Sequence, residues 1–312
     1  MKESIQPSGF LAHSKKVARS LLDNELFIFR DYKSIFGKEI NFLAPQTFNE
    51  KIQIQKLYNK SPKMSALVDK YKARTFIEQK GYGCILNKLL AVYRDPEEID
   101  FDELPEQFVM KCNHSWATNI VCTDKKMLDF DETRALLKSW LEINHYYKHR
   151  EWAYKNIEPR IIVEEYLSGE LKDYKFFCFG GEPAYIEVDT ERTSTRTLDF
   201  YDLEWRHIPC RKGNKPNASR PETRPHNLEE MLEIARELSS EFNFCRIDFL
   251  VNETGFYFGE VTFYPGGGFS GFEPNSYDHE FGRRFDVSAL DIPFSSRCKI
   301  GVIKFLSKMG RV

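Results

Sequence analysis

The sequence has no hydrophobic run that approaches the roughly 20 residues needed to cross a membrane. Its longest apolar runs, such as residues 176–179, have the length of buried strands. Three basic residues near the start, Lys15, Lys16 and Arg19, are not followed by an apolar segment with a small-residue cleavage site, so we predict no secretory signal. These absences predict a cytoplasmic protein without an integral membrane segment.

The chain also has almost no net charge, and its cysteines form no CxxC pair. The 45 basic and 47 acidic side chains leave a net charge of −2, which argues against a nucleic-acid partner held by bulk charge. The seven cysteines form no CxxC pair and most stand in apolar runs, which is typical of reduced, buried thiols in cytosolic proteins. Neither a GxSxG nor a Walker sequence occurs. In contrast, 312 residues, 14% of them aromatic, suffice for about two folded lobes.

Hydrophobic spacing predicts a mainly helical region first and a mixture of strands and helices after Pro105. Thr47 and Glu50 form a capping box, which predicts the start of a helix over 48–58. We expect further helices over 20–36, 65–79, 129–147 and 228–242, and strands over 107–112, 120–122, 160–167, 174–179, 184–189, 244–251 and 256–264. Residues 206–225 hold six basic side chains and four prolines, which predicts a mobile surface loop or a contact for an anionic sugar.

The most informative segment is a predicted hairpin that turns at Gly255. A three-residue loop there would pair Asp248 with Glu260 and Arg246 with Thr262. Because side chains alternate along a strand, all four would lie on one face of the sheet.

Two facing carboxylates repel each other, so Asp248 and Glu260 need a compensating cation. Arg246 is one candidate. Mg²⁺ is a better one, because it prefers carboxylate oxygens and leaves positions for substrate phosphates. A solvated polar sheet face is the alternative. If the pair binds metal, neutralising either carboxylate should raise the metal-free stability and abolish turnover.

Two more features place charge in an unusual setting. Lys111 lies inside an apolar strand, where its tip must reach an anion or, as an edge-strand lysine, water. Glu164 and Glu165 end the strand over 160–167, as hinge residues or as two surface acids.

The order of these features is shared with a known family. The matching segments are FNEK (48–51), DK (69–70), LP (104–105), FVMKCNH (108–114), DYKF (173–176) with Gly181, RIDF (246–249) and EVTFYP (260–265). The chain resembles the ATP-grasp fold, and more closely the TupA-like (teichuronopeptide-biosynthesis type) ATP-grasp proteins, over about residues 25–285. The resemblance implies an α+β fold with two α+β lobes around a nucleotide cleft, preceded by a helical region. The helical region would cover 1–95, the small lobe 96–165, and the large lobe with the metal-binding hairpin 166–312.

The resemblance also implies roles for single residues. Those that would bind ATP are Lys111, His114, Ser115, Asn119, Glu164, Glu165, Tyr166, Leu167, Asp173 and Lys175. The two lysines would contact phosphates, the loop over 113–119 would close over them, the segment 164–167 would hold adenine and Asp173 the ribose. Those that would bind Mg²⁺ are Asp248, Glu260 and Thr262. Arg246 and Lys175 would be catalytic and would stabilise the transferring phosphoryl group.

Two positions depart from the family pattern. The phosphate loop is usually rich in glycine, whereas 114–118 contains none. The third metal ligand of the wider fold is usually Asn, and a threonine hydroxyl at 262 is a poorer ligand, although TupA-like proteins tolerate Thr at this position.

Three other signals have simpler explanations. The glycines at 266, 268 and 271 spell a dinucleotide fingerprint, but Phe-Glu-Pro follows them directly and too few residues remain for a βαβ unit, so we predict a turn over the active site. His145 and His149 are expected to form a surface helix pair. The DxD strings over 100–102 and 129–131 resemble those of sugar-nucleotide glycosyltransferases, but Asp is also a common helix cap.

The resemblance implies an ATP-dependent carboxylate–amine ligase that acts through an acylphosphate. Because TupA-like proteins are associated with bacterial surface polysaccharides such as capsule or O-antigen, the expected carboxylate is a uronic acid of a polysaccharide or its precursor. The expected amine is an amino acid or amino alcohol, and membrane-bound polysaccharide machinery would be a further partner. A glycosyltransferase and a non-catalytic nucleotide-binding module are the alternatives; the first rests on the DxD strings, the second on the missing glycines and Thr262.

Overall fold

The computed structural model describes residues 23–190 and 196–312, and the chain divides into two compact units. The described part of the smaller unit comprises 23–44 and 291–312, and the larger unit runs from Pro45 to Leu290. The first residues of the helix expected over 20–36 lie outside the described part, as does the segment searched for a secretory signal. No helix among the described residues is both long and apolar enough to cross a membrane.

The described residues of the smaller unit include two helices, α2 (Asn24–Phe36) and α10 (Phe294–Lys308). The Asp23 carboxylate caps α2 by accepting the Glu25 amide at 3.2 Å. The two helices are joined by a buried hydrogen bond of 2.6 Å from the Ser296 hydroxyl to the Glu25 carboxylate. Polar contacts therefore fix which face of α10 meets α2.

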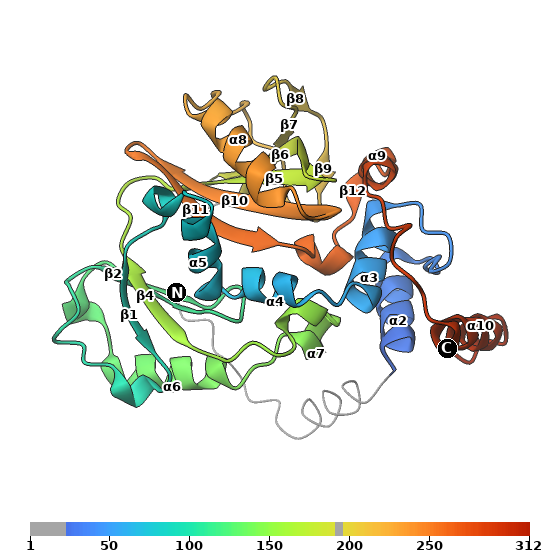
Figure 1. Cartoon of the computed structure of the whole chain (residues 1–312), viewed down its shortest axis with the longest axis horizontal. Coiled ribbons are helices and arrows are strands. Elements are labelled where there is room, and N and C mark those ends of the chain that lie inside the picture. Colours follow the sequence, from blue (N-terminus) through green and yellow to red (C-terminus); the bar gives the residue numbers. More distant parts are fainter. Residues whose placement is uncertain (1–22, 191–195) are drawn as a thin grey trace. The chain divides into compact units, whose positions relative to one another are not determined.

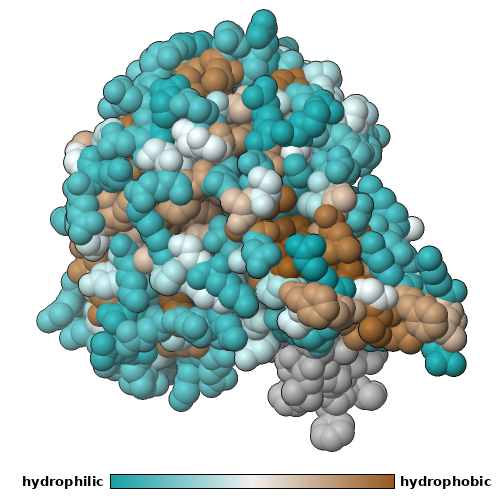
Figure 2. Space-filling view, turned by 45° about the vertical axis from the view of Figure 1, so that its right-hand side comes forward, coloured by the Kyte–Doolittle hydropathy of each residue, from teal (hydrophilic) through white to brown (hydrophobic). Residues whose placement is uncertain are grey.

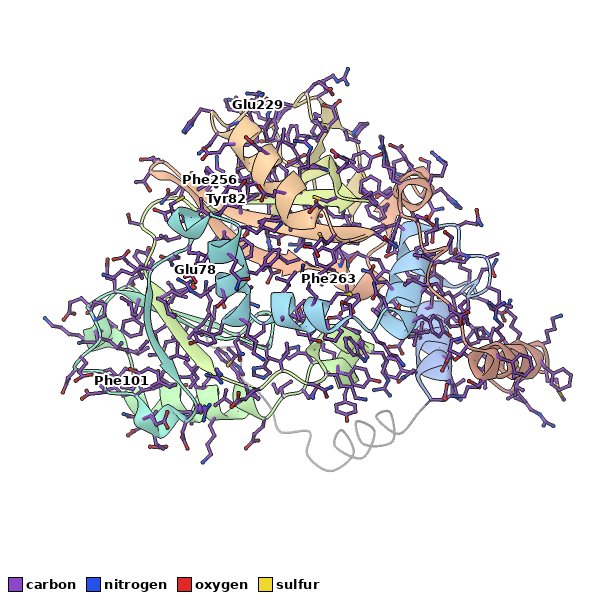
Figure 3. All side chains as sticks on the ribbon, in the orientation of Figure 1. Glu78, Tyr82, Phe101, Glu229, Phe256 and Phe263 are labelled. Carbon is purple, nitrogen blue, oxygen red and sulfur yellow. The ribbon has the colours of Figure 1, made fainter. Side chains whose placement is uncertain are left out.

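The larger unit contains a small antiparallel sheet of four strands in the order β1–β4–β2–β3 (Figure 1). Their bounds are β1 Leu89–Tyr93, β2 Phe108–Cys112, β3 Asn119–Cys122 and β4 Ile161–Glu165. Helix α6 (Phe130–Leu141) packs against it through Leu137, which is fully buried with Phe108. Phe101, labelled in Figure 3, stacks on Phe130 with ring centroids 4.2 Å apart, so the connections also enter this core.

A second sheet has six strands in the order β11–β10–β5–β6–β7–β8. Their bounds are β5 Lys172–Phe179, β6 Glu182–Thr190, β7 Thr197–Tyr201, β8 His207–Ile208, β10 Phe244–Asn252 and β11 Gly255–Thr262. Helix α8 (Leu228–Ser239) crosses one side of this sheet (Figure 1). The Cys178 thiol reaches the Ala235 carbonyl of α8, so alternation along β5 turns Phe176 toward α8 and Lys175 to the opposite face. One face of the sheet is thus core, and the other carries charge at Lys175 beside the buried Phe177, whose ring centroid lies 6.0 Å from that of Phe48.

The remaining elements surround the charged face of this sheet. The helices are α3 (Phe48–Tyr58), α4 (Pro62–Val68), α5 (Lys72–Gln79), α7 (Tyr146–His149) and α9 (Ser276–Arg284). Single 3₁₀ turns are η1 (Gly83–Ile85), η2 (Pro96–Glu98), η3 (Lys125–Met127), η4 (Trp152–Tyr154) and η5 (Pro265–Gly268). A two-stranded ribbon pairs β9 (Arg211–Lys212) with β12 (Phe272–Glu273).

Helix α3 confirms the capping box. The Thr47 hydroxyl accepts the Glu50 amide at 3.2 Å, and the Glu50 carboxylate accepts the Thr47 amide at 3.1 Å. The first residue of the helix, Phe48, is buried and meets the ring of Phe244 edge-on at 5.0 Å. Burying such a ring contributes about 1.5–3 kcal/mol, so the cap and the aromatic anchor together fix where α3 begins.

Several expected elements differ in the structure. The helix over 65–79 is two helices, because the Asp69 carboxylate accepts the amides of Tyr71 and Lys72 (3.0 and 3.3 Å) and interrupts the first one. The helix over 129–147 ends at Leu141, and α7 follows as a separate turn. Strands β1 and β7 were not expected. Residues 206–225 are irregular apart from β8 and β9, as their prolines predict.

Candidate functional site

The hairpin of β10 and β11 pairs Asp248 with Glu260 and Arg246 with Thr262, as predicted. The route to this register differs from the prediction, because Asn252 pairs with Gly255 and the loop has two residues. A β-bulge then restores the expected pairs, since Phe249 faces Phe258 while Asp248 faces Glu260.

Gly259 is the extra residue of this bulge. A Cβ atom at this position would lie 2.9 Å from the Asp248 carbonyl oxygen, closer than such atoms approach. Glycine is therefore required here for the two strands to close, and the bulge turns both carboxylates to the charged face.

Each of the two carboxylates has its own cation. The Arg246 guanidinium donates to both Asp248 oxygens at 2.7 and 2.6 Å, and it lies 3.7 Å from Glu260. The Lys70 ammonium lies 3.4 Å from the other Glu260 oxygen, and the Thr262 hydroxyl donates to Glu260 at 2.9 Å. The sequence left Arg246 and Mg²⁺ as candidates for the cation that offsets the repulsion. In the structure Arg246 pairs with Asp248, and Lys70 is a second cation beside Glu260.

These contacts give the two carboxyl groups different pKa values. Burial raises the pKa of Asp248 to about 6, although Arg246 acts in the opposite direction. Burial also acts to raise the pKa of Glu260, but Lys70 and Arg246 outweigh it and lower that pKa to about 2.

Lys70 was not among the predicted site residues. It enters the site because the chain breaks at Asp69 between α4 and α5. The Asp69 carboxylate also accepts from the Asn113 amide at 2.8 Å, and the Lys70 ammonium donates to the Ser115 carbonyl at 2.6 Å. An Asp-Lys pair inside an amphipathic pattern was the available signal, since Asp disfavours a helix interior.

A second group of charges continues across the sheet from Asp248. Lys175 faces Asp248 on β5 and forms ion pairs with Asp189 and, at 3.8 Å, with Glu187 on β6. Lys212 forms a further ion pair with Glu187. Although burial acts to raise them, these lysines lower the pKa values of both β6 carboxyls. The sequence analysis named Lys175 but neither of its acidic partners.

In the small sheet the structure brings Lys111 and Glu164 together. The Lys111 ammonium of β2 donates to one Glu164 oxygen at 2.7 Å, and Arg74 of α5 approaches the other at 3.2 Å. Glu165 is exposed, and its carbonyl accepts from Asn87 at 2.8 Å. Two predicted ATP-binding side chains are therefore direct partners, and Arg74 is an addition to them.

Three further predicted residues follow the same elements. Tyr166 and Leu167 continue directly from β4, and Leu167 is buried. Asp173 lies on β5, where it faces Asp189 across the sheet. The segment 164–167 thus spans the end of β4 in the small sheet and the residues after it, and Asp173 lies near the start of β5 in the second sheet.

The loop over 113–119 connects β2 to β3. The Ser115 and Thr118 hydroxyls are hydrogen-bonded to each other, and Ala117 has a φ of 58°, so the loop reaches the left-handed region without glycine. His114 is buried with its ring against the Ile143 carbonyl at 3.1 Å. Asn119 is exposed and pairs with Lys111.

A cavity of about 300 Å³ adjoins the hairpin carboxylates. It is lined by Trp116, His149, Glu151, Tyr154, Arg246, Glu260, Thr262, Tyr264, Gly266 and Gly267. The expectation of a surface histidine pair is wrong, because His145 is buried beside the Trp116 ring at 5.1 Å and His149 lines this cavity. The expected turn of glycines is confirmed as η5 in the cavity wall.

Glu151 is the unusual group of this cavity. The residue is only 4% exposed, yet its carboxylate forms no hydrogen bond or ion pair with any described residue. Burial raises its pKa to about 7, against the influence of Lys56 and Lys148. The η5 backbone approaches closely, since a Cβ on Gly267 would lie 3.1 Å from the Glu151 carboxylate. Sequence analysis did not find Glu151.

The two DxD strings have local structural roles, the first in a turn and the second as the cap of a helix. The Asp100 carboxylate accepts the Asp102 amide at 2.9 Å, and the Asp129 carboxylate accepts the Glu132 amide at the start of α6, also at 2.9 Å. Neither string therefore adds to the case for a glycosyltransferase.

Comparison with known proteins gives a family match and distant structural matches. The profile of the family described as TupA-like ATPgrasp matches residues 50–286. The D-alanine–D-alanine ligase from Bacillus anthracis complexed with ATP is 16% identical over 63% of this chain and 54% of its own, with a TM-score of 0.37. The enzyme of the same name from Helicobacter pylori is 15% identical over 70% and 61%, with a TM-score of 0.36.

The ATP-grasp ligase PsnB complexed with minimal precursor is 13% identical over 65% of this chain and 55% of its own, with a TM-score of 0.36. The chain thus spans only 54 to 61% of these three structures. Because the identities and TM-scores are so low, these structures add nothing to the family match. Among curated proteins, none is similar enough to count as a match.

Proposed function

The chain belongs to the TupA-like ATP-grasp family, and we propose that it is an ATP- and Mg²⁺-dependent ligase that joins a carboxylate to an amine through an acylphosphate. The observation that carries this proposal is the hairpin cluster: Asp248 and Glu260 face each other beside Arg246, and they adjoin a cavity whose Glu151 carboxylate has no partner among the described residues. Phosphoryl transfer needs such a concentration of oriented charge more than it needs a protein nucleophile.

We assign ATP to the charged face between the two sheets of the larger unit. Lys111 and Lys175 are the cations for its phosphates, with Ser115 and Asn119 in the loop above and His114 as its buried support. Glu164, Glu165 and the backbone of Tyr166 and Leu167 hold adenine, and Asp173 holds the ribose. The division at about residues 95 and 165 remains our proposal for the lobe boundaries.

Mg²⁺ fits the oxygen atoms of Asp248 and Glu260. This ion is commonly bound by one or two carboxylates together with substrate phosphates and water, and such a donor set is present here, with the Thr262 hydroxyl hydrogen-bonded to one of the carboxylates. When bound, the ion neutralises the charge on the transferring phosphoryl group. Arg246 is held rigidly by Asp248, so its guanidinium is aimed at the same region and stabilises that charge as well.

In the first step a carboxylate oxygen of the substrate bonds to the γ-phosphorus of ATP, the bond from that phosphorus to the bridging oxygen breaks, and ADP leaves. In the second step an amine nitrogen bonds to the acyl carbon, the bond from that carbon to the phosphate oxygen breaks, and phosphate leaves. The ammonium loses one proton before the attack and a second afterwards. The departing phosphate takes the second proton.

We propose that the Glu151 carboxylate binds the ammonium group and accepts the first of these protons. Its carboxylate is buried, faces the cavity and has no partner among the described residues, which is the setting of a base with a pKa near neutrality. Trp116, Tyr154 and Tyr264 line the same cavity, and aromatic faces also favour a cation. The cavity lined by Glu151, which we call the acceptor pocket, therefore suits an amine better than a second carboxylate.

For the carboxylate we propose a uronic acid of a bacterial surface polysaccharide or its precursor, and for the amine an amino acid or amino alcohol. This part rests on the association of the TupA-like family with such polymers. The reaction would take place in the cytoplasm, where ATP is available.

The test is ADP release with ATP and Mg²⁺, measured with glucuronic acid or its nucleotide sugar and a panel of amino acids and amino alcohols. We expect release to require Mg²⁺ and to increase when both substrates are present. Asp248→Asn should abolish it, whereas Glu273→Gln, which changes an exposed carboxylate, should leave it unchanged. Calorimetry that shows tight binding of a sugar nucleotide and none of ATP would refute the proposal.

A further inference from the structure

Helix α10 presents a hydrophobic stripe to solvent. It consists of Phe294, Cys298, Val302, Phe305 and Met309, and we call it the α10 stripe. The exposed fractions are 80% for Phe294, 63% for Phe305, 57% for Val302 and 48% for Met309. At 3.6 residues per turn, the five positions fall within an arc of about 80°, so they form one continuous strip. Figure 2 is turned so that α10 comes forward, and it shows hydrophobic side chains at the surface at the lower right.

The opposite face of α10 already has its partner. Ser296, Ile300, Ile303 and Ser307 are buried, and the Ser307 hydroxyl accepts from Lys33 of α2 at 2.8 Å. The α10 stripe is therefore not needed to hold the smaller unit together. An exposed strip of large apolar side chains on a helix that is already packed indicates an interaction surface.

The charges beside the stripe are mostly basic. Lys299 lies on one side of it, where it pairs with Asp23 at 2.5 Å, and Arg297 lies on the other, 4.0 Å from Asp291. Lys304 and Lys308 lie on the same side as Arg297, with Arg311 just beyond the helix, and these three form no ion pair with a described residue. A partner that combines an apolar layer with negative charge would complement them.

We propose that the α10 stripe is a docking face for an anionic lipid surface, with the helix lying parallel to the bilayer in the headgroup region. A helix with aromatic and aliphatic side chains on one face and lysine and arginine along its borders binds membranes in this way. The apolar side chains enter the acyl boundary, and the basic side chains remain among anionic headgroups. Each of the latter contributes about fivefold in partitioning, the equivalent of about 1 kcal/mol. This proposal is independent of the proposed ligase activity.

A second copy of the chain fits this face less well. A two-fold contact through the stripe would bring two identical sets of five basic side chains together with no acidic side chain of 294–312 between them. A protein with an acidic groove would suit the charge, but nothing in the smaller unit selects a groove over a flat surface. Both occupants are outcomes of the experiment below.

The test uses the full chain and sedimentation with vesicles of phosphatidylcholine alone, or of equal parts phosphatidylcholine and phosphatidylglycerol. The wild type should bind the anionic vesicles, and added salt should weaken the binding. The pair Val302→Ser and Phe305→Ser should reduce partitioning at least about tenfold, because a buried phenyl ring alone is worth that much. The pair Lys308→Glu and Arg311→Glu should reduce it at least about 25-fold, at about fivefold for each charge.

The matched control is Val121→Ser with Met127→Ser, which removes two apolar side chains that are 57% and 83% exposed elsewhere on the surface. This control should bind vesicles like the wild type, and all variants should keep the wild-type melting temperature. The proposal is overturned if the wild type does not bind anionic vesicles, or if the stripe variant binds them equally well. A concentration-dependent dimer that the stripe variant loses, without vesicle binding by the wild type, would assign the face to a second copy instead.

Discussion

Replacing Glu151 by Gln should make the protein more stable and less active at the same time. Glu151 is buried in the wall of the cavity, and no described residue donates a hydrogen bond to its carboxylate or pairs with it. The charged and titratable groups that act on it are Lys56 and Lys148, which favour its charge, and Glu260, which opposes it. Gln has nearly the same shape but no charge, so the substitution removes a desolvation cost and leaves no cavity.

The size and sign of the stability effect follow from the pKa of Glu151. Burial raises this pKa from 4.5 to about 7, and each unit corresponds to 1.36 kcal/mol, so the ionised carboxylate costs about 3 kcal/mol. The folded protein holds this proton more tightly than the unfolded chain. The contribution to stability is therefore fully present below about pH 4.5 and is lost as the pH rises through about 7.

The assay compares thermal melting of Glu151→Gln and wild type between pH 5 and pH 8 without ligand. The two should melt alike near pH 5, and the variant should melt roughly 6–12 °C higher at pH 8, at 2–4 °C per kcal/mol. Formation of the amide should fall at least about a hundredfold, as expected for loss of a general base. Hydroxylamine, which is largely neutral at pH 7, should still trap the acylphosphate.

The matched control is Glu187→Gln, which changes another fully buried carboxylate. Because Glu187 is paired with Lys175 and Lys212, its neutralisation should lower stability, opposite in sign to the change at Glu151. If Glu151→Gln melts below the wild type at pH 8, Glu151 has a partner in the folded protein. Unchanged amide formation would remove it from the reaction.

Three further substitutions test the hairpin and the nucleotide site. Asp248→Asn should abolish ADP release, because it removes one of the two facing carboxylates that would hold Mg²⁺; ADP release at the wild-type rate would contradict this. Lys111→Ala should weaken ATP binding as measured by calorimetry. It should cost little stability, because Arg74 still pairs with Glu164. An unchanged affinity for ATP would mean that Lys111 has only a structural role. Gly259→Ala should lower the free energy of unfolding by about 1–3 kcal/mol, because a Cβ atom there collides with the Asp248 carbonyl. It should also weaken Mg²⁺-dependent ATP binding. A wild-type melting curve would show that the bulge tolerates a side chain.

The sequence predicted the pairs of the hairpin but not how the chain reaches them. Alternation and turn chemistry are local, so Asp248, Glu260, Arg246 and Thr262 could be placed on one face from their spacing. The bulge at Gly259 could not be predicted, because it depends on how closely two strands approach. The hairpin reaches the predicted pairs with a two-residue loop and a bulge, whereas the prediction assumed a three-residue loop and no bulge.

The long-range ion pairs of the site could not be predicted from the sequence, for a different reason. Lys70 reaches Glu260 from a helix break about 190 residues earlier in the chain, and Lys212 reaches Glu187 from the short strand β9. Glu151 lies in a connection, and its burial depends on η5, which Gln53 of α3 holds through the Gly267 and Gly268 carbonyls at 3.1 and 2.7 Å. Such contacts follow from the fold and leave no periodic signal in the sequence.

The pairing of charges divides the site into two functional parts. Arg246 with Asp248, Lys175 with Asp189, and Lys111 with Glu164 hold one another in the ligand-free chain. In the proposed site, ATP and Mg²⁺ would bring the same two kinds of charge, so their binding would exchange partners: phosphates would take the cations, and the metal would take carboxylates such as Asp248.

An exchange of this kind leaves no charge without a partner at any stage, and it keeps the cations oriented before ATP arrives. Glu151 differs, because it has no partner to exchange within the described part of the chain, and its pKa of about 7 lets it retain a proton near neutral pH. An incoming ammonium would supply the missing counter-charge, lower the pKa of Glu151 and so promote its ionisation. Amine binding would then be tightest above about pH 7, where Glu151 is ionised without help, and the affinity for the amine should fall as the pH decreases from 8 to 6 in wild type but not in Glu151→Gln. A pH-independent amine affinity in the wild type would separate Glu151 from the acceptor pocket while leaving the ATP site unaffected.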